Sequence, residues 1–351
     1  MSSGHELRLG TRGSPLALWQ AHAVAARIAE TGGPSCRIVI IKTSGDRLQE
    51  APLSEVGGKR LFVKEIEEAL LRHDIDLAVH SSKDMPVVLP DGLAIAGVLP
   101  REDPRDAVVL PASAGIRDAA LAIDDPATHD GATGDGAIET LRMDELTSRL
   151  GRAPSIGTGS VRRIAQLWSL FPGARFAPIR GNLDTRLRKL DAGEQQALVL
   201  AAAGLRRLGF ASRISLTLPA AVCVPAPGQG IVAMEIRDED DAARRAVAPI
   251  DDAAAGAALR AERALVEALG GGCQTPVGAL ASPLDDATLE LVAVVASLDG
   301  RRAVRGSARA ARKEAAVLGR SVARQLIAGG AADILADARR EQGAVERIRP
   351  G

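Results

Sequence analysis

The sequence predicts two α/β domains followed by a smaller α+β domain. Strand and helix patterns alternate through the first hundred residues and again from Ser155, which is typical of a parallel or mixed sheet covered by helices. The last hundred residues instead place strands ahead of a helix, as in a small α+β domain. A chain of 351 residues is long enough for two or three domains with separate cores.

The first region has the clearest element signals. Ser14 and Pro15 predict a helix start, because serine caps a helix and proline fits its first turn. The β-branched residues of 36–42 predict a buried strand. The remaining patterns of this region are strands at 7–11, 76–81 and 93–99 and helices at 15–30 and 61–73.

Two proline-rich segments, residues 99–107 and 225–230, are candidate hinges. Between them the alternation resumes after a segment at about 112–153, which we expect to be a surface insertion with one short helix near 140–150. The strands expected here are 106–110, 155–158, 175–180, 196–201 and 213–218, with helices at 160–171, 182–193 and 202–209.

The third region begins after the strand expected at 231–237. We predict a helix ending at the GGGC sequence of residues 270–273, an antiparallel sheet, and one long alanine-rich helix to about Arg340. The strands of this sheet are expected near 277–281, 287–297 and 303–310.

Composition narrows the function classes. With 44 basic and 44 acidic residues the formal net charge is +0, which argues against a general nucleic-acid binder. No apolar run is long enough to span a bilayer and the start lacks a secretory signal, so we expect a cytoplasmic protein. Three widely spaced cysteines predict neither a disulfide framework nor a zinc site.

The GTGSVRR sequence, residues 157–163, lies at a strand-to-helix turn and suits an anion. The hydroxyls of Thr158 and Ser160 and the guanidiniums of Arg162 and Arg163 could bind carboxylate or phosphate there. A solvated basic helix start is the alternative. Because arginine stands where the third glycine belongs, a dinucleotide fingerprint is disfavoured.

Two further arginines follow the next strand. Arg180 stands at its end and Arg186 in the first turns of the following helix. Open α/β sheets bind ligands at the carboxyl ends of their strands, so these side chains could share a crevice with Arg162 and Arg163. Surface arginine is the default for each residue alone, but the four together favour a polyanionic ligand.

The sequence VHSSKDMP, residues 79–86, packs Ser81, Lys83 and Asp84 into one turn after a strand. A capped turn with a surface ion pair is the simpler interpretation. The functional hypothesis is an acid–base carboxylate beside a cation. We expect His80 to be a packed strand residue. The GGKR sequence at 57–60 is no P-loop and is read as a glycine loop that presents Lys59.

These segments together resemble the porphobilinogen deaminase family, also called hydroxymethylbilane synthases, along nearly the whole chain. The stretches that carry the resemblance include LGTRGSPLALWQA, DLAVHSSKDMP, IGTGSVRR, IRGNLDTRL, PAPGQGIVAMEIR and AERALVEALGGGCQTPVGA. The family joins four porphobilinogen molecules head to tail with release of ammonia, giving the linear tetrapyrrole hydroxymethylbilane. It does so on a dipyrromethane cofactor bound by a thioether, which the resemblance places on Cys273.

The resemblance also implies a fold and a domain plan. Two α/β domains of the type II periplasmic-binding-protein kind form a cleft, and a small α+β domain with an antiparallel sheet follows. The implied boundaries are residues 1–103 with 228–248 for the first domain, 104–227 for the second, and 249–351 for the third.

The chemistry explains the implied site. The resemblance implies that Asp84 is the catalytic residue, and its negative charge would lie where a cationic pyrrole develops. Each pyrrole carries an acetate and a propionate, which arginine binds bidentately. By resemblance the cofactor contacts Ser81, Lys83, Thr158, Ser160, Arg162, Arg163 and Arg186, the substrate contacts Arg12, Ser14, Arg180, Arg186 and Arg207, and an entrance loop holds Lys59 and Phe62.

Three departures from the family pattern stand out. Glu55 occupies a commonly basic position, Gly159 gives GTGS in place of the common GTSS, and the insertion is longer than in compact relatives. The alternative function is a non-catalytic binding protein that uses the same clamp for a small polyanion. We expect a monomer with porphobilinogen as its partner and no metal, membrane or nucleic acid.

Overall fold

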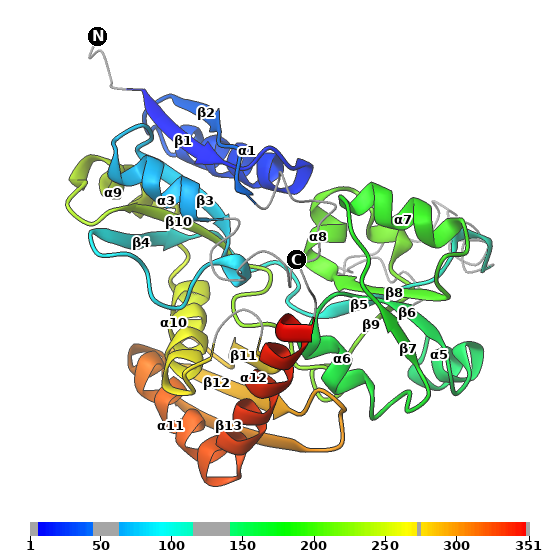
Figure 1. The fold of residues 1–351 in the computed structure, drawn as a ribbon. Helices are drawn as coiled ribbons and strands as arrows, with labels where there is room; N and C mark the ends of the chain where they lie inside the picture. Colours follow the sequence, from blue (N-terminus) through cyan, green and yellow to red (C-terminus); the bar gives the residue numbers. More distant parts are fainter. Residues whose placement is uncertain (1–5, 45–62, 115–140, 272–274, 349–351) are drawn as a thin grey trace, which may run out of the picture.

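The computed structural model describes residues 6–44, 63–114, 141–271 and 275–348, which form three sheets and their helices (Figure 1). The first two sheets have five strands each and the third has three. This architecture confirms the predicted fold class. The predictions for Glu55, Lys59, Phe62 and Cys273, and for the central part of the insertion, concern residues outside those described.

The first sheet has the strand order β2-β1-β3-β10-β4. Strand β1 pairs in parallel with β2 and β3, whereas β10 runs antiparallel to both β3 and β4. Helices α1 and α9 bury their apolar residues with one face of the sheet, and α3 buries Ile66 and Leu70 against the other. The elements are β1 (Leu7–Thr11), α1 (Pro15–Glu30), β2 (Cys36–Ile40), α3 (Lys64–Leu71), β3 (Leu77–Ser81), β4 (Leu93–Val98), β10 (Val232–Arg237) and α9 (Asp241–Val247).

The second sheet has the order β7-β6-β8-β5-β9 and repeats the plan of the first. Strand β6 pairs in parallel with β7 and β8, and β5 runs antiparallel to both β8 and β9. In each sheet the antiparallel strand arrives through one of the predicted hinges. The elements are β5 (Asp106–Val109), α5 (Met143–Leu150), β6 (Ser155–Gly157), α6 (Val161–Leu167), β7 (Arg175–Ala177), α7 (Leu183–Asp191), β8 (Ala197–Ala201), α8 (Ala202–Arg207) and β9 (Leu216–Thr217).

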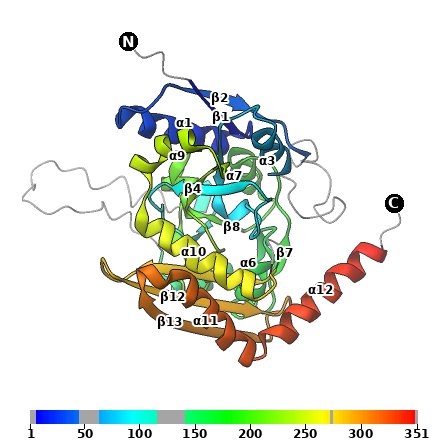
Figure 2. The same ribbon diagram turned by 90° about the vertical axis from the view of Figure 1, so that its left-hand side faces the viewer.

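The third sheet is an antiparallel meander packed against helices α10 and α11 (Figure 2). A Cβ on Gly319 of α11 would lie 2.2 Å from the Ala261 carbonyl oxygen of α10, so glycine is what lets these helices approach. The elements are α10 (Ala253–Ala268), β11 (Val277–Pro283), β12 (Thr288–Ala296), β13 (Ala303–Ala311), α11 (Ala315–Ala328) and α12 (Ala331–Ile348).

Several predicted elements were wrong in extent. The helix expected at 160–171 covers only Val161–Leu167, the strand expected at 175–180 covers only Arg175–Ala177, and two further differences have a local cause. The long C-terminal helix is two helices, α11 and α12, because Gly330 takes a left-handed φ of 95° between them and ends the first. The strand expected at 213–218 shrinks to the two residues of β9, since a short 3-10 turn, Ala211–Arg213, precedes it.

A buried ion pair joins the first hinge to the third domain. Arg101 donates from Nη1 to Glu262 Oε1 at 2.6 Å, and Glu262 on α10 is fully buried. Glu262 also accepts from the backbone N–H groups of Gly228, at 2.6 Å, and Ala281, at 2.8 Å. One carboxylate therefore ties both hinges to the third sheet.

Candidate active site

Strands β1 and β3 end side by side, and we call this part of the first domain the first wall. Residues from the two strand ends, from α1 and from α3 line a hollow of about 60 Å³. The predicted N-cap is confirmed, since Ser14 Oγ accepts from the Ala17 N–H at 3.3 Å. The hollow brings four predicted site residues together: Arg12, Ser14, Ser81 and Asp84.

Asp84 ends a 3-10 turn, Ser82–Asp84, that continues directly from β3. Its side chain is exposed, whereas Ser82 and Met85 on either side are buried. Met85 packs with Ile231 and Leu259, and the Ser82 N–H donates to the Ile231 carbonyl at 3.0 Å. The turn thus holds an accessible carboxylate on a rigid support.

The second hinge presses against this turn. Gly228 has a φ of 73°, and a Cβ there would lie 2.7 Å from Ser82 Oγ. Both the left-handed backbone and the close approach require glycine.

In the second sheet, β6 and β8 end side by side next to the start of β5, and we call this part the second wall. It buries two arginines around Asp106. Arg162 Nη1 donates to Asp106 Oδ2 at 2.6 Å and to the Val224 carbonyl at 2.8 Å. Arg163 Nε donates to Asp106 Oδ1 at 2.9 Å. Burial alone would raise the pKa of Asp106, but the two guanidiniums outweigh it and hold that pKa well below its ordinary value.

Gln229 in the second hinge connects this cluster to the first wall. Its Nε2 donates to Asp106 Oδ1 at 2.9 Å, and its Oε1 accepts from Lys83 Nζ at 3.4 Å and from Arg163 Nη2 at 3.5 Å. One amide therefore bridges a cation of the first sheet and the ion cluster of the second.

Arginines of the second wall lower the pKa values of cations in both walls by electrostatic repulsion. Loss of hydration is the main reason that the pKa of Lys83 falls to about 8; Asp84 and Asp106 oppose the shift, and Arg163 and Arg162 add to it. The pKa of Arg186 is lowered first by burial and then by Arg163, against the attraction of Asp84. The structure therefore places Lys83, Asp84, Arg163 and Arg186 in one electrostatic neighbourhood.

The other predicted residues lie at the strand ends of the second sheet. Thr158 is buried after β6, and its Oγ1 accepts from the Ser160 N–H at 3.4 Å. Ser160 precedes α6 and is partly exposed, as is Arg180 between β7 and α7. Arg207 lies at the end of α8, where its Nη2 donates to the Gly230 carbonyl at 2.6 Å.

Sequence reasoning missed Asp106, Gln229 and Trp19. Gln229 falls in a predicted hinge, and Asp106 falls where the other predicted hinge overlaps the strand expected at 106–110. Trp19 lies on α1 with its ring 5.4 Å from the Arg207 guanidinium carbon. Charged or amide residues inside a proline-rich hinge were the available signal. His80 is buried on β3, as expected.

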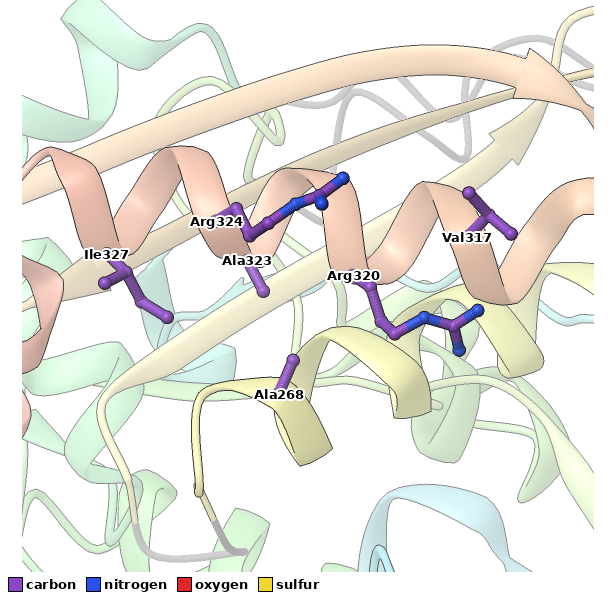
Figure 3. A pocket seen from close by; sticks show the side chains of 6 residues that line it. All are labelled: Ala268, Val317, Arg320, Ala323, Arg324 and Ile327. Atoms are coloured by element: carbon purple, nitrogen blue, oxygen red, sulfur yellow. The ribbon is translucent and has the colours of Figure 1, made fainter.

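A larger hollow of about 330 Å³ lies elsewhere, on the outer face of the third domain (Figure 3). It holds none of the predicted site residues and runs between the end of α10 and one face of α11. Its lining is Ala268, Val317, Arg320, Ala323, Arg324 and Ile327.

Comparison with known families decides the identity. Residues 7–245 match the family described as porphobilinogen deaminase, dipyromethane cofactor binding domain, and residues 257–328 match its C-terminal domain. The chain belongs to the porphobilinogen deaminase family. Deaminases of this family from Syntrophobacter fumaroxidans and Moorella thermoacetica are 42% and 41% identical to it. The alignments cover 94% and 96% of this chain and 96% and 98% of those relatives.

Solved structures of solute-binding proteins are more distant. An ancestral cationic amino acid solute-binding protein gives a TM-score of 0.39 at 11% identity, over 70% of this chain and 89% of that one. A periplasmic solute-binding protein from Desulfovibrio salexigens gives 0.39 at 10% identity, over 71% and 73%.

Family membership confirms the predicted activity, enzyme class and cofactor. The chain polymerises four porphobilinogen molecules into hydroxymethylbilane on a dipyrromethane primer, within tetrapyrrole biosynthesis. The alternative of a non-catalytic binding protein is thereby rejected. In the described ranges, no helix combines the length and hydrophobicity needed to cross a bilayer, and no group of three metal-binding side chains occurs.

Proposed function

We propose that Asp84 is the reacting carboxylate of this deaminase and that the cations around it hold the carboxylates of the cofactor and the growing chain. The observation that carries the proposal is the electrostatic neighbourhood shared by Asp84 of the first wall and Arg163 and Arg186 of the second. Asp84 would stabilise positive charge on a pyrrole and take up the proton that the ring loses.

The charge balance fits the dipyrromethane cofactor. Arg162 and Asp106 also act on Lys83, so among the described residues this neighbourhood contains four cations, Lys83, Arg162, Arg163 and Arg186, and two carboxylates, Asp84 and Asp106. The cofactor's two pyrroles bring acetate and propionate groups that would neutralise the excess. When bound, the cofactor supplies the pyrrole carbon to which porphobilinogen is joined.

The contacts of the cationic residues suggest which of them would bind the cofactor directly. Lys83 and Arg163 would bind cofactor carboxylates most directly, because Gln229 places both beside the opposite wall. Arg162 contributes charge from a deeper position on Asp106. The other proposed cofactor contacts are Ser81, Thr158, Ser160 and Arg186. The proposed substrate contacts are Arg12, Ser14, Arg180, Arg186 and Arg207.

We propose Cys273 as the covalent anchor. A thioether forms from a thiolate, so the anchor needs an accessible thiol of ordinary or lowered pKa. Burial, reinforced by Asp106, raises the pKa of Cys223 to about 12. Cys36 on β2 also has a raised pKa, chiefly from burial. Neither of these cysteines suits the role.

Intact-mass measurement of apoprotein incubated with porphobilinogen tests the anchor. We expect a dipyrromethane-sized addition on the wild type and on Cys36→Ser and Cys223→Ser, and none on Cys273→Ser. An addition that survives Cys273→Ser would reject the assignment. Holoprotein that carries the addition but makes no hydroxymethylbilane would reject the roles proposed for the cleft.

The finer domain and cellular assignments are proposals as well. The strands of each sheet fall within one of the proposed units: residues 1–103 with 228–248, residues 104–227, and residues 249–351. We also propose that the enzyme is a cytoplasmic monomer that binds no nucleic acid. Sedimentation equilibrium of the holoenzyme tests the oligomeric state; a dimer at micromolar concentration would contradict it.

A further inference from the structure

Helices α1 and α8 contact one another and so connect the first wall with the second. Leu16 of α1 lines the hollow that contains Asp84, and a Cβ on Gly204 of α8 would lie 3.7 Å from its Cδ2 atom. Figure 1 shows α1 of the first domain reaching toward α8 of the second. Side chains on these two helices therefore bridge the domains beside the site.

Trp19 and Arg207 form the polar part of this bridge. The Arg207 guanidinium carbon lies 5.4 Å from the centroid of the Trp19 ring, within the range of a cation–π interaction. Trp19 is 39% exposed, so it is only partly covered by the protein at this contact.

Arg207 retains binding capacity in this position. The Gly230 carbonyl accepts one of its five N–H donors, at 2.6 Å. Among the described residues no carboxylate lies within ion-pair distance of it. Glu102 pairs with Arg206 at 3.9 Å and attracts the Arg207 charge from farther away. A cation held by a ring and a carbonyl keeps its charge available for an incoming anion.

We propose that Trp19 is a positioning residue for porphobilinogen binding: its indole face holds the Arg207 guanidinium at the α1–α8 contact, ready for a pyrrole carboxylate. The inference rests on the proposed role of Arg207 in substrate binding. It adds that a residue of the first domain sets the geometry of a binding group of the second. Substrate capture and the contact between the two walls are thereby coupled.

Steady-state kinetics of the holoenzyme test the coupling. Trp19→Leu removes the ring and should raise KM for porphobilinogen about 3- to 10-fold, with kcat within about 2-fold, since a cation–π contact of this kind is worth about that much. Trp19→Phe keeps an aromatic face and should restore most of the affinity. Arg207→Gln should raise KM at least as much.

The double variant separates positioning from mere packing. If Trp19 acts through Arg207, Trp19→Leu with Arg207→Gln should raise KM no more than Arg207→Gln alone. Multiplying effects would mean independent roles and would overturn the inference. An unchanged KM in Trp19→Leu, with a raised KM in Arg207→Gln, would overturn it and leave the Arg207 assignment standing. An unchanged KM in Arg207→Gln would overturn both.

Fluorescence adds a readout that packing alone would not produce. The chain has two tryptophans, so Trp168→Phe leaves Trp19 as the only indole. Porphobilinogen should change the Trp19 emission of this variant, and the change should vanish when Arg207→Gln is added. A signal that persists without Arg207 would count against the proposal.

Discussion

The two walls have the same strand topology but differ in the burial of their charged side chains. In the first wall the strand ends present Asp84 on an exposed turn. In the second wall Arg162 and Arg163 are buried around Asp106, which is fully buried. A lone carboxylate can stay in contact with water at little cost, whereas neighbouring cations need an internal counter-charge.

This difference in burial matches the two roles proposed above, reaction for Asp84 and binding for the arginines. In the role proposed for it, Asp84 would change its partners as the chain grows, and an exposed position on a rigid turn suits that role. The arginines are proposed to hold carboxylates in fixed places, and buried, hydrogen-bonded guanidiniums suit that role. Gln229 touches both sets and keeps the walls in register.

The largest effect is expected from a change at Asp84 in the first wall. Asp84→Asn removes the negative charge without changing shape, and we expect turnover to fall about 10²- to 10⁴-fold, the usual worth of a general acid–base. Cofactor loading, measured by intact mass, should stay complete because the second wall is untouched. Asp91→Asn, an exposed change soon after the same turn, is the control. Turnover near the wild-type rate would mean that another group handles the protons.

A change in the second wall should lower the free energy of unfolding. Asp106→Asn leaves two buried guanidiniums without a counter-charge, so we expect the apoprotein to lose about 3–5 kcal/mol of unfolding free energy in urea. The holoprotein should lose less, because cofactor carboxylates replace part of the missing charge. Asp238→Asn, whose carboxylate is 72% exposed, should change stability little. Equal losses in apoprotein and holoprotein would show that Asp106 and the cofactor do not share these arginines.

The arginines themselves should govern cofactor assembly. Arg163→Ala and Arg162→Ala each remove a charge partner, and we expect assembly to slow about 10-fold, in line with one unpaired charged hydrogen bond. Arg163→Ala should have the larger effect, because Arg163 also approaches Gln229. Arg188→Ala, an exposed change on α7, is the control. Wild-type loading in both variants would remove these residues from the cofactor site.

Lys83 gives the smallest effect, through pH. Its pKa of about 8 lies below the ordinary 10.5, so the folded apoprotein loses this charge as the pH rises through about 8. Cofactor assembly should therefore fall about threefold more from pH 7 to 9 in the wild type than in Lys83→Arg, which keeps its charge. Lys64→Arg, on an exposed side chain, should follow the wild type. Parallel profiles for wild type and Lys83→Arg would exclude this titration.

Much of this arrangement was predictable because it is local. The Ser14 cap, the strands that end at Ser81 and Gly157, and the buried His80 all follow from short sequence patterns. The family resemblance supplied the chemistry.

The Asp106 cluster was not predictable, because its members are distant in the chain. Asp106 lies 57 residues from Arg163 and 123 from Gln229. No spacing rule connects such residues, and only the crossing of the hinges brings them together. The break at Gly330 was missed for a different reason: glycine inside an alanine-rich helical pattern does not by itself show which conformation it takes.

The strand plan also bears on how the enzyme is made. All strands of the second sheet have been synthesised once residue 217 is added, but the first sheet waits for β10, residues 232–237. Domains generally fold as units during synthesis. The strands of the second wall can therefore pair before those of the first wall, where the Asp84 turn packs against Gly228 and Ile231. The Asp84 turn therefore gains its support only after the strands around Asp106 have been made, and the proposed anchor Cys273 is synthesised later still.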